Sequence, residues 1–230
     1  MSTATDFSSV PVLDYSLLNE NITQLRHALI NVGFLYLSNH PVSQADIDLL
    51  ISYIPKLFAL PQEAKEKIRM VHSEHFLGYS LLGAELTKGA VDQREQFDFA
   101  TKHECRWREG DPDHLRLWGP SQVCDILVIL PVVNLNLRIT VKWPDEELIP
   151  GFRDVLERYL VQVEDLSYKF TSLIAQAFGL GSDGLAQFYD IPPLMQHRAK
   201  IVQYPVVEGS SDQGVGPHYD AGFLTFVRFN

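Results

Sequence analysis

The chain has 230 residues, of which 46% are hydrophobic and 21% charged, an ordinary globular mixture that excludes extensive disorder. A formal net charge of −10 without any Lys/Arg-rich run argues against nucleic-acid binding and favours a small-molecule substrate. The two cysteines exclude a disulfide scaffold. The chain has no signal-like start and no uninterrupted apolar run, which predicts a cytoplasmic protein without a membrane span. We also expect it to be a monomer.

Strand and helix patterns alternate in the first part of the chain. In order they are a strand at Val10–Tyr15, a helix from Ile22 to Gly33, a strand at Phe34–Leu37, a helix at Gln44–Phe58 and a short charged helix that starts at Pro61. Apolar residues three and four positions apart predict the helices. Ser43 with Asp46 resembles a capping box at the start of the second one.

Glycines break the pattern after His75, and the chain then turns to strands and one long helix. Glu95–Phe99 predicts a strand with Phe97 and Phe99 on one face. Lys102–Pro120 is polar and predicts a loop. The longest helix is expected from Phe152 to Ala177, with Gly179 at its C-cap. Further short strands are expected at Lys200–Tyr204, around His218–Asp220, and at Phe223–Phe226.

The segment Gly216–Thr225, GPHYDAGFLT, carries the most specific chemistry. His218 and Asp220 stand two residues apart, and alternate side chains of a strand leave the same face. An imidazole and a carboxylate would then project into one cavity. They are two of the three ligands of the two-His, one-carboxylate triad that holds Fe(II).

Three blocks together resemble the isopenicillin N synthase-like oxygenases. His218-Tyr-Asp220-Ala-Gly-Phe-Leu-Thr225 matches the family's His-x-Asp-x-Gly-x-Leu-Thr motif, and Tyr204-Pro205 is similar to its Tyr-Pro strand. The start of the chain (VPVLDY and ALINVGFLYLSNHPV) and the segment REQFDF resemble the family's N-terminal region.

This resemblance implies a mixed α+β fold, in which an N-terminal helical region flanks a partial double-stranded β-helix, or jelly roll. It implies that His218 and Asp220 bind Fe(II), that Tyr204 contacts 2-oxoglutarate, and that O2 is the second cosubstrate. A small organic substrate would be hydroxylated, desaturated or cyclised.

Two features depart from the family pattern. The family's second iron histidine and its Arg-x-Ser do not occur in the ten residues after Asp220, so we expect the distal strands to be missing and the iron site to be incomplete. Residues 123–142 read as an atypical insertion, because its removal joins WGPSQ to WPDEELIPGF as the family pattern has it. The codons of Val123-Cys124 can begin with the GT of an intron donor site, and the Lys142 codon can end with the AG of an acceptor site. The codons of Val227-Arg228 can also begin with GT. We therefore hypothesise that both segments are unspliced intron translated as protein.

The expected organisation is therefore an N-terminal region at 1–122, the insertion at 123–142, and at 143–230 the long helix with the first part of the oxygenase core. Two alternatives remain open. One is an oxidase that uses no 2-oxoglutarate, and the other is an inactive fragment that serves at most as a binding module.

Other polar residues have less specific interpretations. Arg94, Glu95 and Asp98 line the substrate mouth or form a solvated strand edge. Five other histidines are expected to be loop or surface residues; they are His40, His72, His75, His103 and His114.

Overall fold

The computed structural model describes residues 10–101, 103–119, 143–206, 213–220 and 222–229. The expected insertion at 123–142 lies outside this described part. The chain divides into two units, one with the residues up to Asp48 and Glu157–Pro193, the other with Leu49–Leu156 and the residues from Leu194. Among the described helices, none combines the length and the apolar composition needed to cross a membrane.

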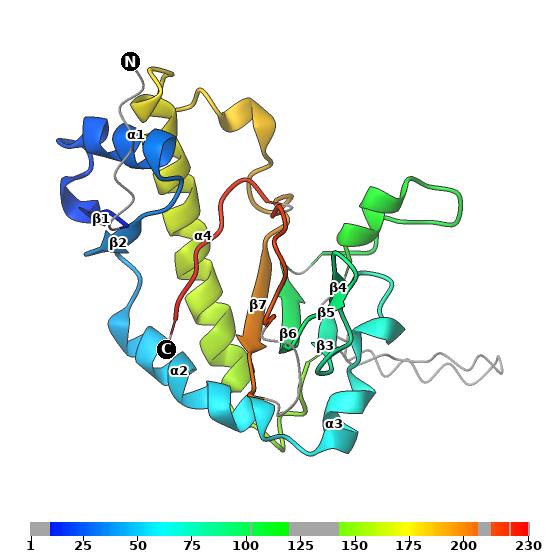
Figure 1. Ribbon diagram of the computed structural model, residues 1–230. Coiled ribbons are helices and arrows are strands. Elements are labelled where there is room, and N and C mark those ends of the chain that lie inside the picture. Colours follow the sequence, from blue (N-terminus) through cyan, green and yellow to red (C-terminus); the bar gives the residue numbers. More distant parts are fainter. Residues whose placement is uncertain (1–9, 102, 120–142, 207–212, 221, 230) are drawn as a thin grey trace. The chain divides into compact units, whose positions relative to one another are not determined.

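The first unit is mainly helical. Its elements are β1 (Val12–Asp14), η1 (Tyr15–Leu17), α1 (Ile22–Asn31), β2 (Tyr36–Ser38), the start of α2 (Gln44–Phe58), most of α4 (Phe152–Ala177) and η4 (Ala186–Phe188). β1 and β2 pair in parallel (Figure 1). The apolar stripes of the helices are buried, Leu25 and Ala28 on α1 and Phe170 and Ile174 on α4. The helix predictions are confirmed, and Gly179 has the positive φ of +76° expected of a C-cap glycine.

The capping box at the start of α2 is only half formed. Ser43 Oγ accepts a hydrogen bond from the Asp46 N–H at 3.3 Å, as predicted. The return bond is missing, because the Asp side chain is one methylene shorter than the Glu that usually makes it. Ser43 N–H instead donates to Oε1 of Gln162 at 2.7 Å, and the Asp46 carboxylate pairs with Arg158 at 3.2 Å.

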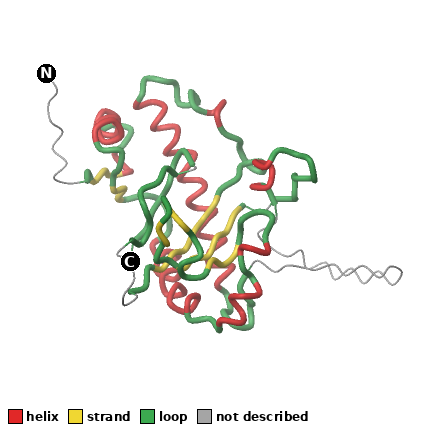
Figure 2. The backbone as a smooth tube through the Cα atoms, turned by 45° about the vertical axis from the view of Figure 1, so that its right-hand side comes forward, coloured by secondary structure: helices red, strands yellow, loops and turns green. Residues whose placement is uncertain are grey.

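The second unit holds a small antiparallel sheet. Its elements are the rest of α2, α3 (Gln62–Lys67), η2 (Met70–His72), β3 (Gly78–Ser80), β4 (Leu86–Thr87), β5 (Ala90–Val91), β6 (Glu95–Ala100), η3 (Asp113–Leu117), the start of α4, and β7 (Arg198–Gln203). The sheet order is β3-β6-β7, with β6 in the middle, while β4 and β5 form a separate hairpin. Figures 1 and 2 show the three strands side by side.

The two faces of β6 differ sharply. Phe97 and Phe99 are 0% and 1% exposed and belong to an aromatic cluster, as the alternation predicted. The cluster also contains Phe58, Tyr79, Trp143 and Phe152. The opposite face carries Gln96 and Asp98, which are buried polar residues. One face of β6 therefore belongs to the hydrophobic core, and the other carries polar side chains.

The strands predicted around His218–Asp220 and at Phe223–Phe226 are not found in the described residues 213–220 and 222–229. A strand exists only where a neighbour supplies the ladder of backbone hydrogen bonds. Alternating side chains in the sequence show that a segment can join a sheet, but not which strand would pair with it. The described structure is thus a mixed fold of helices and sheet, and its described strands form no closed barrel.

Candidate metal site

The two predicted iron ligands lie next to each other. Nε2 of His218 is 3.3 Å from Oδ1 of Asp220. Two neighbouring ligands about 2.1 Å from an octahedral divalent ion stand about 3 Å apart, so this spacing suits a shared metal ion. The convergence predicted from strand alternation is present, although the segment is not a strand.

The second polar atom of each ligand already has a partner. Nδ1 of His218 is 2.8 Å from the carbonyl oxygen of Gly216. A carbonyl only accepts, so Nδ1 carries a hydrogen, and in the neutral ring Nε2 then keeps its lone pair. Thr225 Oγ1 donates to Oδ2 of Asp220 at 3.3 Å, which leaves Oδ1 toward His218. Outer partners of this kind orient the ligands of metal sites.

The cavity expected around the pair is not formed by the described residues. The side chains of His218 and Asp220 are 46% and 60% exposed. Within the described part of the chain, no three His, Cys, Asp or Glu side chains gather where they could hold a metal ion. The physical reason is that no described strand pairs with this segment to wall it in. The residues present fit two ligands of the three-ligand site.

Tyr204, the expected cosubstrate contact, directly follows β7 and is 52% exposed. A Cβ added at Gly214 would lie 2.9 Å from Cδ1 of the Tyr204 ring. The ring therefore packs against the backbone at Gly214, four residues before His218. The structure thus places Tyr204 beside the approach to the predicted ligands.

The polar face of the sheet continues toward Tyr204. Asp98 pairs with Lys200 of β7 in the sheet register, and Gln96 pairs with Val202; continued alternation would put Tyr204, one residue beyond the end of β7, next in the same row. Asp98 accepts from Nε2 of Gln96 at 3.0 Å and lies 3.5 Å from Nζ of Lys200. Burial raises the pKa of Asp98 above its ordinary value, although the nearby Lys200 and Arg198 act against it.

The expectation of a solvated edge at Arg94, Glu95 and Asp98 is wrong, because β6 is the central strand. Glu95 lies on the core face, where it pairs with Lys65 at 2.7 Å and accepts from the Tyr79 hydroxyl at 2.7 Å. Arg94 forms ion pairs with Asp92 and Glu85 and is mostly buried. Glu95 therefore has a structural role, whereas Arg94 and Asp98 remain on the polar side.

The histidine expectations hold with one correction. His75 is buried, not a surface residue, because its Nδ1 lies 2.8 Å from the Arg116 carbonyl oxygen, and its own carbonyl accepts from Arg198. His72 ends the short η2, so the two histidines do not share a helix. Nε2 of His103 lies 2.8 Å from the Met195 carbonyl oxygen, and among the described residues neither His40 nor His114 belongs to a group of three side chains that could hold a metal ion.

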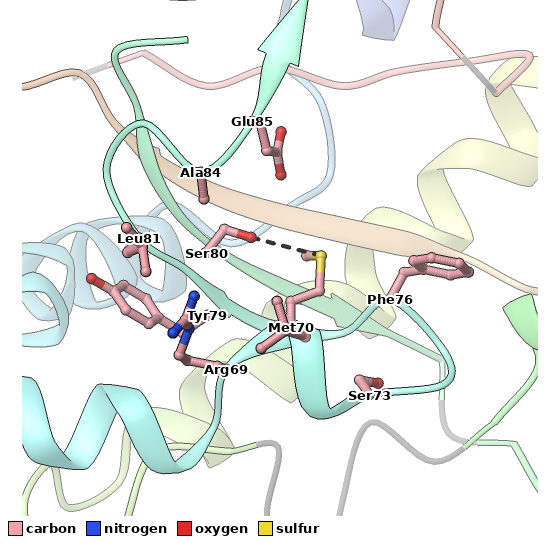
Figure 3. Close-up of a pocket in the computed structure, with 10 residues that line it drawn as sticks. Arg69, Met70, Ser73, Phe76, Tyr79, Ser80, Leu81, Ala84 and Glu85 are labelled. Carbon is pink, nitrogen blue, oxygen red and sulfur yellow. Dashed lines mark hydrogen bonds between the residues drawn. The ribbon is translucent and has the colours of Figure 1, made fainter. Parts of the chain in front are cut away.

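A pocket of about 300 Å³ lies beside β3, between η2 and the β4–β5 hairpin (Figure 3). Met70, Phe76, Leu81 and Ala84 give it apolar walls. Two of its polar side chains are already engaged, since Ser80 Oγ lies 3.7 Å from Met70 Sδ, and Glu85 binds Arg94 and Gln96. The pocket therefore offers room with mainly apolar walls.

Sequence reasoning missed Asp92, which is 0% exposed. Its carboxylate contacts Gln213 and Gly216, more than 120 residues further along the chain. An Asp that follows a two-residue strand has no distinctive sequence signal, so only the structure identifies it.

Comparison with known proteins identifies the family. The family described as "non-haem dioxygenase in morphine synthesis N-terminal" matches residues 10–125, half of the chain. The 2-oxoglutarate-dependent dioxygenase frbJ of Dothideomycetidae sp. (strain 11243) is 38% identical over 232 residues, which cover 96% of this chain and 56% of that protein. The chain belongs to the Fe(II)- and 2-oxoglutarate-dependent oxygenase family. A 2-oxoglutarate-dependent dioxygenase of Gibberella zeae (strain PH-1) is 34% identical over 236 residues, with 97% and 56% coverage.

Solved oxygenase structures share the fold. A full-length protein of Neurospora crassa in complex with alpha-KG aligns with a TM-score of 0.62 and 21% identity, over 90% of this chain and 57% of that one. A likeness at this identity concerns the fold alone. This oxygenase chain spans slightly more than half the length of the relatives and neighbours that it matches.

Proposed function

We propose that the chain supplies two iron ligands and a cosubstrate contact of an oxygenase that oxidises a small organic molecule, with Fe(II) as cofactor and 2-oxoglutarate and O2 as cosubstrates. The observation that carries this proposal is the 3.3 Å approach of His218 Nε2 to Asp220 Oδ1, with the other atom of each group held by a neighbour. Hydroxylation, desaturation and ring closure all fit this chemistry.

Each residue has a separate task in this proposal. His218 and Asp220 hold the metal, which on binding supplies the site where 2-oxoglutarate and O2 meet. Tyr204 donates its phenol hydrogen to a carboxylate of 2-oxoglutarate, and its half-exposed ring beside Gly214 leaves the hydroxyl accessible. The polar face with Asp98 and Lys200 continues the same row of side chains and would meet the polar part of a substrate.

The finer fold proposed for the oxygenase is a partial double-stranded β-helix with β6 and β7 among its strands. The third ligand of the family pattern is a histidine, and the ten residues after Asp220 contain none. Residues 123–142 are proposed to be foreign to this architecture. Cytoplasmic location and a monomeric state remain predictions.

Anaerobic titration with Fe(II) and 2-oxoglutarate tests the proposal. A metal-to-ligand charge-transfer band in the visible spectrum is expected for the chain, and it should be lost in His218→Ala and in Asp220→Ala. His114→Ala, an exposed histidine outside the site, is the matched control and should keep the band. A band that persists without His218, or no band in the unaltered chain at saturating Fe(II), contradicts the proposal. The second result would favour the inactive-fragment alternative.

A further inference from the structure

The buried carboxylate of Asp92 is linked to the predicted iron ligand through one residue. Oδ1 of Asp92 accepts from the Gly216 N–H at 3.3 Å and from Nε2 of Gln213 at 3.1 Å. Oδ2 accepts from Thr87 Oγ1 at 2.7 Å, and Arg94 lies 3.3 Å away as the counter-charge. All oxygen atoms of a fully buried carboxylate are thus paired, which is what burial of a charge requires.

Gly216 is held through both of its backbone polar groups, which belong to the two successive peptide units. Its N–H points to Asp92, and its carbonyl accepts from Nδ1 of His218 at 2.8 Å. A second tether runs beside the first, since the Gln93 N–H donates to the Gln213 carbonyl at 3.0 Å. The carboxylate therefore fixes the backbone from which the imidazole takes its orientation.

The close approach also explains the glycine at this position. A Cβ added at Gly216 would lie 2.8 Å from Cγ2 and 3.0 Å from Cβ of Thr87, closer than real contacts allow. Only a residue without a side chain brings its N–H within reach of Asp92 beside the β4 strand.

The direction of the Gly216 carbonyl decides which nitrogen of His218 can bind metal. Neutral histidine carries one ring hydrogen, and free imidazole side chains can place it on either nitrogen. A carbonyl at Nδ1 selects the Nδ1–H form, so Nε2 is the nitrogen left to face Asp220. A loosened Gly216 would remove that selection.

We propose that Asp92 is a positioning residue for His218: it anchors Gly216 and so sets the tautomer and direction of the imidazole. The inference rests on the proposed function for its link to iron, but the tautomer itself can be observed without metal. The alternative is that Asp92 only stabilises the β4–β5 hairpin and has no effect on the ligand.

The test uses the whole chain with ¹⁵N-labelled histidine. Long-range ¹H–¹⁵N correlation spectra at about pH 8.5, where imidazole is neutral, report the tautomer of His218. The wild type should show Nδ1–H, and Asp92→Ala should shift His218 toward Nε2–H. Asp92→Asn should restore the wild-type pattern, because its amide oxygen can still accept from Gly216. Anaerobic Co(II) titration should show a loss of about 10–100-fold in affinity for Asp92→Ala, the range seen for outer partners of metal ligands.

A destabilised control separates positioning from stability. Ile68→Val and Ile68→Ala shorten a side chain that is 3% exposed, at a residue that takes part in none of the hydrogen bonds described above. Both should lower thermal stability and leave the tautomer and the Co(II) affinity unchanged. If Asp92→Ala keeps the Nδ1–H form and binds Co(II) like these controls, the positioning role is wrong. If the wild type binds no Co(II) but Asp92→Ala shifts the tautomer as expected, the proposed function fails and the positioning role stands.

Discussion

The ion pair between Lys65 and Glu95 gives the sharpest stability prediction. Nζ of Lys65 lies 2.7 Å from Oε1 of Glu95, and the two side chains are 9% and 14% exposed. Tyr79 donates to the same oxygen at 2.7 Å, and the Phe58 carbonyl accepts from Lys65 at 3.1 Å. Burial, together with the neighbouring carboxylate, raises the pKa of Tyr79 well above its ordinary value, which agrees with a phenol that stays a donor.

Glu95→Gln removes the counter-charge and leaves a buried ammonium with neutral acceptors, the Phe58 carbonyl and the new amide oxygen. Breaking a buried pair in this way costs about 3–5 kcal/mol, and the slight exposure of both groups places the expected loss at about 3 kcal/mol. For a chain of this size, that loss corresponds to a fall in Tm of roughly 6–12 °C.

Urea unfolding followed by tryptophan fluorescence measures the loss. Lys65→Met combined with Glu95→Gln removes both charges and should be more stable than Glu95→Gln alone, because no unpaired charge remains. Glu63→Ala, an exposed acidic residue of α3, is the matched control and should change stability by less than about 0.5 kcal/mol. A loss below about 1 kcal/mol for Glu95→Gln, or a double variant less stable than the single one, would refute the reasoning.

Three further predictions concern the polar face, the cosubstrate and the insertion. The raised pKa of Asp98 means that the native state binds its proton more tightly than the unfolded chain, so this carboxyl costs stability as pH rises from about 4 through its native pKa. The unfolding free energy of Asp98→Asn minus that of the wild type, measured in urea, should therefore be more positive at pH 7 than at pH 4. The opposite trend contradicts the raised pKa of Asp98. Tyr204→Phe should weaken 2-oxoglutarate binding by about 10–100-fold in calorimetry with Fe(II) present, the value of one hydrogen bond to a charged group, and an unchanged affinity rules out the contact. Deletion of residues 123–142 should preserve the urea midpoint and raise the soluble yield, whereas a clear fall in the midpoint would show that the segment belongs to the fold.

Local patterns in the sequence predicted most elements, since the buried face of a helix or strand follows from the spacing of apolar residues that are close in the sequence. The limits of α2 matched the prediction, and the alternation at Phe97 and Phe99 identified the core face of β6. What local patterns could not supply was pairing between distant segments. The partner of Glu95 lies 30 residues away, and without it the strand read as a possible solvated edge.

The candidate site shows the same division. The chemistry of His218 and Asp220 is local, two residues apart, and the sequence predicted their convergence. Their enclosure is not local, because the walls of a cavity come from strands that pair across the chain, and the described residues leave both side chains largely exposed. Asp92 belongs to the non-local part as well, at 124 residues from Gly216. A motif can therefore name the atoms that would bind a metal, while the contacts that select one nitrogen of an imidazole emerge only from the folded chain. For this reason the tautomer of His218 is a stricter test of the site than the presence of the motif.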